Sequence, residues 1–423
     1  MQPSEGASLS TKEVLRFGDV RRLLTAGSVL TTGISLQAAA LGLQAFRITG
    51  RPADLGWIGL CEFLPAALLV LVTGTVADRF NRKVVALFAI GGEVMSSLAL
   101  VFYALSDPTE VWPLFVIAFV YGVARAFLAP ATRSMPPMVA PEGGLPKVVA
   151  MNSATWTGAT ILGPVLSGLL YAIAPWVAYF VASSLMIVGG LMFSGLRFIR
   201  PPDPAISANR PTFRHAIEGL VFIRRTPILL AAISLDLFAV LFGGAVALLP
   251  VIAEERLGVG EFGYGLLRAS PGIGAALMAV LLAFRPMRRR IGRVLLLAVF
   301  VFGASTVVLG LTRSYVLAFI ALVVLAGADM VSVYVRGALV PLVTPDEKRG
   351  RVLAVENVFI GASNELGAFE SGLVAQAIGT PATVIGGGVA TIAVVGVWWL
   401  AFPSLRDVDR FEDLVSEQHL VAE

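Results

Sequence analysis

A small set of ionisable side chains lies inside long apolar stretches of this sequence, and these are the groups most able to do chemistry. They are Glu62, Glu93, Arg125, Asp236, Arg268, Asp329, Arg336, Glu365 and Glu370. Within a bilayer a charged side chain costs at least a few kcal/mol, so it is rare without a partner or a function. A carboxyl group in such a place can bind and release a proton, because apolar surroundings favour its neutral form and a nearby arginine favours its charged form.

The composition indicates that the apolar stretches cross a membrane. Of the 423 residues, 57% are hydrophobic and 14% are charged, and the mean hydropathy is +0.83. A soluble protein would carry about 25% charged residues, and a helix needs about 20 apolar residues to span a bilayer. Twelve segments meet this length, at 23–46, 55–76, 84–105, 112–133, 148–172, 175–197, 227–252, 263–284, 294–312, 315–338, 352–378 and 382–402.

The 32 Lys and Arg residues fall mostly on one side of the predicted membrane. Of these, 25 lie in the N-terminal segment, the even-numbered links and the C-terminal tail, whereas the odd-numbered links hold only Arg47, Arg51, Arg256 and Arg313. Cytoplasmic loops carry such an excess of cations, so we expect both termini in the cytoplasm. Since topology explains the cations, the net charge of +4 does not indicate a nucleic-acid partner.

A densely charged link, Gly74–Lys83, joins the second and third apolar segments. Its fixed positions are Gly74, Asp78, Arg79, Arg82 and Lys83, and their spacing resembles the loop between the second and third helices of major facilitator superfamily transporters. The resemblance implies that the aspartate bonds across the cytoplasmic face to the other half when the protein faces outward. We therefore expect Asp78 to act in gating, with Arg133 and the start of the eleventh segment as partners.

The same resemblance implies the fold class. We expect an all-α membrane protein with twelve transmembrane helices in two pseudo-symmetric six-helix bundles. The pattern of Arg133–Pro141 recurs in Arg336–Pro345, about 204 residues later, as in transporters built by internal duplication. The predicted parts are an N-terminal cytoplasmic segment at 1–22, bundles at 23–198 and 227–402, a cytoplasmic link with an amphipathic helix at 199–226, and a cytoplasmic tail at 403–423.

In this superfamily the first and fourth helices of each half line the central cavity. By resemblance, Arg125, Asp236 and Asp329 would face it. Our hypothesis is that Asp236 or Asp329 binds and releases the proton that drives transport; the alternative is a permanent Arg–Asp clamp that only holds helices together. A cavity near Arg125 and Arg268 could accept an anionic siderophore, but Arg268 could equally pair with Asp236.

The fifth segment contains Gly163, Pro164 and Gly168 in a pattern that resembles the helix-bending element of proton-antiporting exporters in this superfamily. Proline within a membrane helix bends it and removes a backbone donor. Two positions depart from that element, because Ala159 and Ser167 replace glycines. Simple helix packing explains the same glycines equally well.

The likeness covers essentially the whole chain and extends to the bacterial branch that contains the enterobactin exporter and macrolide efflux proteins. The most specific part is the run from Thr344 to Glu365. It implies export of a siderophore or drug-like amphipathic molecule across the inner membrane, coupled to proton entry. A proton-coupled importer or a lysophospholipid translocator of the same fold is the alternative.

The remaining polar groups have two readings. Asn364, Glu365 and Glu370 lie among small residues, which favours structural packing over contact with substrate or protons, and Arg336 belongs to the same group of possible polar contacts. We expect Glu93 to be structural and leave the role of Glu62 open.

Several other functions are excluded at sequence level. Cys61 is the single cysteine, and His215 and His419 lie outside the apolar segments. We therefore expect no metal site and no cofactor. No nucleophile triad or phosphate-binding glycine loop is present at membrane depth, so the chain should not be an enzyme. We expect a monomer whose partners are the lipid bilayer, a small-molecule substrate and protons.

Overall fold

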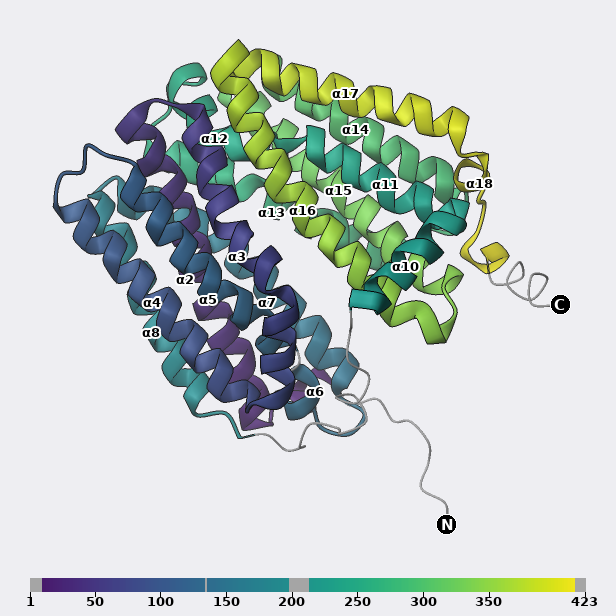
Figure 1. Cartoon of the computed structure of the whole chain (residues 1–423), viewed down its shortest axis with the longest axis horizontal. Helices are drawn as coiled ribbons and strands as arrows, with labels where there is room; N and C mark the ends of the chain where they lie inside the picture. The colour runs from purple at the N-terminus through teal and green to yellow at the C-terminus, as the bar shows by residue number, and fades with distance from the viewer. Residues whose placement is uncertain (1–9, 134, 198–212, 415–423) are drawn as a thin grey trace. The chain divides into compact units, whose positions relative to one another are not determined.

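The computed structural model describes residues 10–133, 135–197 and 213–414, without the side chains of residues 70–71, 74–75, 77–79 and 213–216. Within these ranges the ordered elements are helices, and there is no strand. Figure 1 follows them along the chain from purple to yellow. The predicted all-α class is therefore confirmed.

The first half of the chain forms two short helices and six long ones. They are α1 (Thr11–Val14), α2 (Gly18–Thr49), α3 (Pro52–Arg79), α4 (Arg82–Leu105), α5 (Trp112–Arg133), α6 (Pro136–Val139), α7 (Leu145–Tyr171) and α8 (Pro175–Ser194). The second half begins with the amphipathic α10 (Phe213–Arg225). It continues with α11 (Pro227–Phe242), η1 (Gly244–Leu248), α12 (Leu249–Val251), η2 (Ile252–Arg256), α13 (Glu261–Phe284), α14 (Ile291–Leu311), α15 (Tyr315–Val343), α16 (Asp346–Ile378), α17 (Thr380–Ala401) and α18 (Pro403–Arg406).

Ten helical segments of the described residues are long and apolar enough to cross a membrane. The other two predicted segments correspond to α7 and α16, which are 27 and 33 residues long. These two helices carry more polar side chains, and α16 begins with the charged run Asp346–Arg351. Both nevertheless exceed the length of about 20 residues that a bilayer requires, so the structure is consistent with twelve spans.

The helices gather into two compact units. One comprises residues Met1–Thr49 and Cys61–Arg210, and the other comprises Gly50–Leu60 and Pro211–Glu423. In the first unit α2 packs on α7 and α8, while α4 packs on α5 and α8. In the second unit α14 packs on α15 and α17, α13 packs on α15, and α11 packs on α16.

The predicted span at 227–252 is present as one membrane-length helical segment, Pro227–Arg256, but it is not a single regular α-helix. Helix α11 ends at Phe242. After Gly243 come the 3-10 turn η1, which begins at Gly244, the short α12 and the π-turn η2. A Cβ on Gly243 would lie 2.4 Å from the ring of Phe302, and one on Gly244 would lie 2.4 Å from the carbonyl oxygen of Gly367. Only glycine allows the backbone to approach its neighbours this closely.

The amphipathic α10 packs on α16. A Cβ on Gly219 would lie 2.8 Å from the carbonyl oxygen of Arg351, whose guanidinium contacts Glu218 at 2.5 Å. Ile223 is buried, whereas Ile217 and Leu220 are exposed. The helix therefore buries one face against the second unit and leaves apolar side chains on its outer face.

The glycine–proline element of α7 faces α2. Gly163, Pro164 and Gly168 are buried, and a Cβ on Gly163 would lie 2.6 Å from the Cβ of Ser35 and 2.8 Å from the backbone of α2. Helix packing alone accounts for a glycine at this position.

We predict that Gly163→Ala destabilises the first unit by about 1–3 kcal/mol, because the added methyl group overpacks the α2–α7 contact. Gly158→Ala, in the same helix but with nothing within 4 Å of its added Cβ, is the matched control and should be neutral or slightly stabilising, since alanine favours a helix over glycine. Thermal unfolding in detergent measures both. Equal midpoints for the two variants would contradict the close approach.

Candidate functional site

Three charged side chains meet in the interior of the second unit. Arg336 of α15 contacts Asp236 of α11 at 2.8 Å and Glu356 of α16 at 3.1 Å. Their exposed fractions are 3%, 5% and 7%, respectively. One guanidinium thus links three helices through two ion pairs that water scarcely reaches.

The chemistry of arginine explains why this residue occupies the centre. A guanidinium carries five N–H donors in a planar fork, so different edges can serve different carboxylates. Its Nη2 reaches Asp236 and its Nη1 reaches Glu356. Its Nε donates to the Ser332 hydroxyl at 3.4 Å, and that hydroxyl donates to Asp236 at 3.4 Å. Ser332 precedes Arg336 by four residues, so the two lie on one face of α15.

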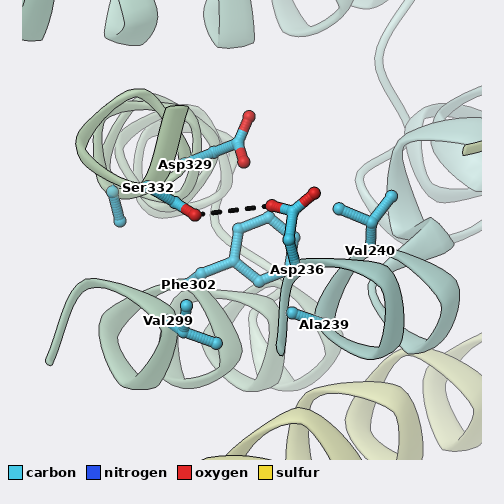
Figure 2. Close-up of a pocket in the computed structure, with 8 residues that line it drawn as sticks. Asp236, Ala239, Val240, Val299, Phe302, Asp329 and Ser332 are labelled. Atoms are coloured by element: carbon cyan, nitrogen blue, oxygen red, sulfur yellow. Dashed lines mark hydrogen bonds between the residues drawn. The ribbon is translucent and has the colours of Figure 1, made fainter. Parts of the chain in front are cut away.

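Asp329 lies nearly one turn before Ser332 on α15 and completes the site. Figure 2 shows its carboxyl group and that of Asp236 at one small cavity, with the Ser332 hydroxyl bonded to Asp236. The cavity also contacts Phe302 and Ala239, and its volume is about 10 Å³. This is about the space that one water molecule needs.

The charges of this site do not balance if all its acids are ionised. Asp236, Asp329 and Glu356 supply three carboxyl groups, and Arg336 supplies one positive charge. Arg336 is committed to Asp236 and Glu356, and among the described residues no ion pair or hydrogen bond reaches Asp329. Uncompensated charge in a buried setting is costly. Chemically, the arrangement is suited to holding and releasing a proton at Asp329.

The structure brings together most of the predicted second-half residues and corrects one pairing. Asp236, Asp329 and Arg336 share the site, but Arg268 does not join them. Its Nη1 donates to the carbonyl oxygen of Val246 in the 3-10 turn η1 at 3.0 Å. The suggested Arg268–Asp236 pair is therefore wrong, and Arg336 is the partner of Asp236.

Sequence reasoning missed Glu356. It falls within the eleventh predicted segment, which begins at residue 352, and so met the same criterion of an acid inside an apolar stretch. Its position could have indicated the pairing with Arg336, which lies twenty residues earlier in the chain, on the preceding helix. A short link at Thr344 and Pro345 turns the chain back, so these two positions lie at similar depth.

The first unit holds a separate charged pair. Arg125 of α5 lies 3.5 Å from Glu62 of α3, with 52% of the arginine side chain and 12% of the glutamate side chain exposed. The helices approach closely at this point, since a Cβ on Gly122 would lie 2.3 Å from the carbonyl oxygen of Glu62. The role left open for Glu62 is thus at least that of an ion-pair partner.

The polar residues of α16 make mostly local contacts. Asn364 donates to the carbonyl oxygen of Ile360 at 2.8 Å within its own helix. Glu370 accepts from the Ser371 hydroxyl at 3.5 Å. A Glu365 carboxylate oxygen would lie 3.3 Å from a Cβ on Gly59, so this glutamate covers the start of α3. Their substrate or proton role stays a prediction.

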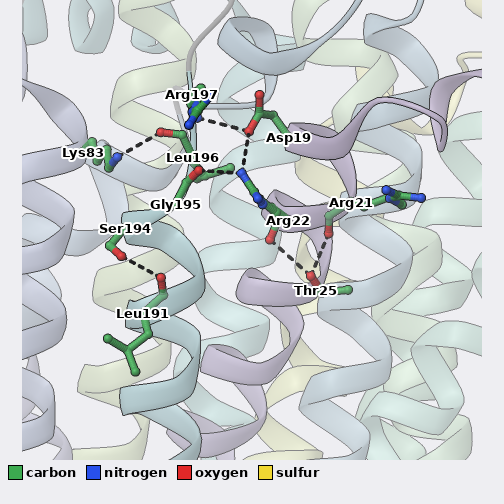
Figure 3. A network of polar contacts seen from close by, with 10 residues as sticks. All are labelled: Asp19, Arg21, Arg22, Thr25, Lys83, Leu191, Ser194, Gly195, Leu196 and Arg197. Atoms are coloured by element: carbon green, nitrogen blue, oxygen red, sulfur yellow. Dashed lines mark hydrogen bonds and ion pairs between the residues drawn. The ribbon is translucent and has the colours of Figure 1, made fainter.

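The charged hairpin, which begins at Gly74, is described only in part, because the side chains of Asp78 and Arg79 lie outside the described residues. Lys83 donates to the carbonyl oxygen of Leu196 at 2.9 Å, beside Arg22, which donates to that of Gly195 at 2.9 Å (Figure 3). Cations at the end of α8 satisfy carbonyl groups and oppose the negative end of the helix dipole. Arg133 is exposed at the last residue of α5. The gating role of Asp78, with Arg82 and Arg133, stays a prediction.

Comparison with known proteins gives one family. A family model described as transmembrane secretion effector matches residues 13–423. Macrolide efflux protein A of Streptococcus pyogenes is 24% identical over 375 residues, which cover 86% of this chain and 90% of that protein. Multidrug efflux pump Tap of Mycolicibacterium fortuitum is 24% identical over 409 residues, which cover 91% and 95%.

A third relative is matched over a shorter length. The MFS-type transporter YfiS of Bacillus subtilis (strain 168) is 29% identical over 284 residues, which are 64% of this chain and 63% of that protein. The match therefore spans less than two thirds of YfiS.

Solved structures share the fold. The nucleoside transporter NupG superposes with a TM-score of 0.69 at 13% identity, covering 91% of this chain and 99% of that one. A bacterial homologue of the human lysosomal transporter Spinster gives 0.72 at 16% identity, covering 92% and 99%.

We predict that Arg336→Met destabilises the second unit by about 3–5 kcal/mol, because it leaves two buried acids without their cation. The loss should shrink as the pH falls, since protonation removes the unpaired negative charges. Arg289→Met is the control: it breaks an ion pair with Asp409 whose arginine is 69% exposed, and such pairs contribute about 0–1 kcal/mol. Unfolding midpoints of both variants, measured across pH, test this prediction. Equal losses of stability in Arg336→Met and Arg289→Met would contradict it.

Proposed function

We propose, from the premise that this chain belongs to the transmembrane secretion effector family of the major facilitator superfamily, that it exports a small amphipathic molecule in exchange for protons. The export would run from the cytoplasm across the bacterial inner membrane by alternating access, with both termini in the cytoplasm. The observation that carries the proposal is the buried site of three carboxyl groups around one guanidinium, next to a cavity with room for about one water.

The proton would bind at Asp329. When Asp329 is protonated it is neutral. The positive charge of Arg336 then compensates part of the negative charge on Asp236 and Glu356. When the proton leaves to water, a carboxylate forms in the same cavity as Asp236. Two like charges in a poorly solvated site repel each other strongly, so the deprotonated site favours a different arrangement of α11 and α15. A ligand that biases a two-state element in this way can drive the transition between states.

The sequence left two hypotheses for these residues, a proton-binding carboxylate and a permanent Arg–Asp clamp. We propose that the cluster contains both. The Arg336 pairs with Asp236 and Glu356 form a clamp between helices, whereas Asp329 is the group that exchanges its proton. In this proposal Asp236 is ionised through its contact with Arg336. Its negative charge then makes the ionised form of Asp329 less favourable. Asp329 is therefore our choice over Asp236 as the proton carrier.

The substrate class rests on the relatives. Two of them are named for efflux, one of macrolides and one of multiple drugs, which supports export of an amphipathic molecule. A siderophore is the second substrate class that the sequence resemblance implies. The small cavity at Asp329 does not hold either, so substrate and proton would bind at different places and be coupled through the helices.

Metabolite profiling tests the transport direction. We predict that medium from cells containing this chain is enriched in at least one amphipathic compound relative to cells without it, and that the enrichment disappears when the proton gradient is collapsed. Accumulation of the compound inside the cells would instead indicate import. Enrichment that survives collapse of the gradient would contradict proton coupling.

The compound so identified allows a direct test of the carboxylates. In proteoliposomes, Asp329→Asn should abolish transport driven by a pH gradient yet keep exchange of labelled for unlabelled compound, because an amide cannot release a proton. Asp236→Asn should weaken both, since it removes a partner of Arg336. Asp407→Asn, which alters an exposed pair with Arg406, is the control and should transport normally. Full pH-driven transport by both Asp236→Asn and Asp329→Asn would exclude the carboxylate mechanism.

A further inference from the structure

A second buried acid lies in the first unit, outside the site described above. Glu93 of α4 has an exposed fraction of 0%. Neither of its carboxylate oxygens has a hydrogen-bond partner among the described residues. The nearest hydroxyl groups along its helix donate elsewhere: Ser96 to the carbonyl oxygen of Gly92 at 3.0 Å, and Ser97 to that of Tyr179 at 3.2 Å. The helix does not itself supply donors to this acid.

An ionised carboxylate in this position would be unstable. The free-energy cost of burying a charge that has no hydrogen bonds is large, so a carboxylate in such a place takes up a proton and becomes neutral. A purely structural role, as expected from the sequence, does not explain why an acid occupies this position. A neutral glutamine has the same shape and carries no charge whose burial would be costly. An acid is useful where the proton can also leave.

The charge of Arg125, on the neighbouring helix α5, acts on Glu93. Helices α4 and α5 nearly touch, since a Cβ on Gly92 would lie 2.9 Å from the Cβ of Ala124. These two residues directly precede Glu93 and Arg125. Arg125 and Glu62 are the charged groups whose fields act on Glu93, and α8, which also packs on α4, carries no acidic or basic residue. Arg125 is half exposed and contacts Glu62 at 3.5 Å.

We propose that Glu93 is a proton-binding site of the first unit, controlled by the position of Arg125. In the arrangement observed, the carboxyl group holds its proton while Arg125 lies on Glu62. When the O–H bond of Glu93 breaks, the proton passes to water, and the guanidinium moves to bridge both carboxylates. Arg336 bridges Asp236 and Glu356 in this way in the second unit. The site goes beyond the proposed function and does not depend on proton exchange at Asp329.

Infrared difference spectroscopy on the full chain in lipid nanodiscs tests the proposal. It follows the C=O stretch of protonated carboxylic acids, which ionised carboxylates lack. We expect a band that is present at low pH, disappears as the pH is raised and is missing in Glu93→Gln. In Arg125→Gln the band should persist to higher pH, because no guanidinium remains to compensate the anion. Glu93→Asp should shift its frequency, which assigns the band even if the glutamine variant fails to fold.

The controls separate this site from the one in the second unit. Asp329→Asn should leave the Glu93 band and its pH midpoint unchanged. The proposal is overturned if wild-type and Glu93→Gln spectra agree at every pH, since Glu93 would then be ionised throughout. It is also overturned if the band never disappears at high pH, or if Arg125→Gln leaves the midpoint where it was.

Discussion

Arg336 brings a positive charge into an interior that water scarcely reaches, and that charge has to be matched where it lies. Two carboxylates on two other helices supply the match, so α11, α15 and α16 are tied together at a single guanidinium. A buried ion pair adds little net stability compared with an apolar contact, but removing one partner is expensive. Helices α11, α15 and α16 are thus linked by Arg336, Asp236 and Glu356, and removing any one of these side chains breaks a buried ion pair.

The surrounding structure follows from this constraint. Asp236 reaches Arg336 from α11, which packs on α16. Just after α11, Gly243 comes close to Phe302 and Gly244 comes close to Gly367. Asp329 is held at the edge of the cluster by the same face of α15 that carries Ser332. Arg336 is already shared by Asp236 and Glu356, so it makes no ion pair with Asp329.

The first unit uses a different kind of polar contact. Its buried bonds include neutral ones, such as the hydroxyl of Tyr179, which donates to Gln44 at 2.6 Å, and Arg125 lies near the surface with Glu62. The two halves share a repeated sequence pattern, but their buried charges differ. Among the described residues, the second unit has the Arg336 cluster, whereas the first unit has Glu93, whose carboxylate oxygens have no hydrogen-bond partner there. The two units therefore differ in how their described buried charges are arranged.

Much of the fold followed from composition and from the spacing of charges, because a bilayer imposes strict length and polarity on each helix. Asp236, Asp329 and Arg336 could likewise be singled out from the sequence, since an acid or an arginine inside an apolar segment is rare. Their partners were not, because pairing depends on which faces of the helices meet. The break at Gly243 redirected Arg268 to the carbonyl group of Val246, and Glu356 joined Arg336 only after the chain turned at Pro345.

A difference titration tests the central claim most directly. Potentiometric titration of the wild-type chain and of Asp329→Asn, both in lipid nanodiscs, counts the protons that each takes up over the pH range in which transport operates. If Asp329 exchanges a proton beside the Arg336 cluster, the wild-type chain will bind one more proton per molecule than the variant. Coincident curves over that range would contradict the claim, since they would show that Asp329 keeps one charge state throughout.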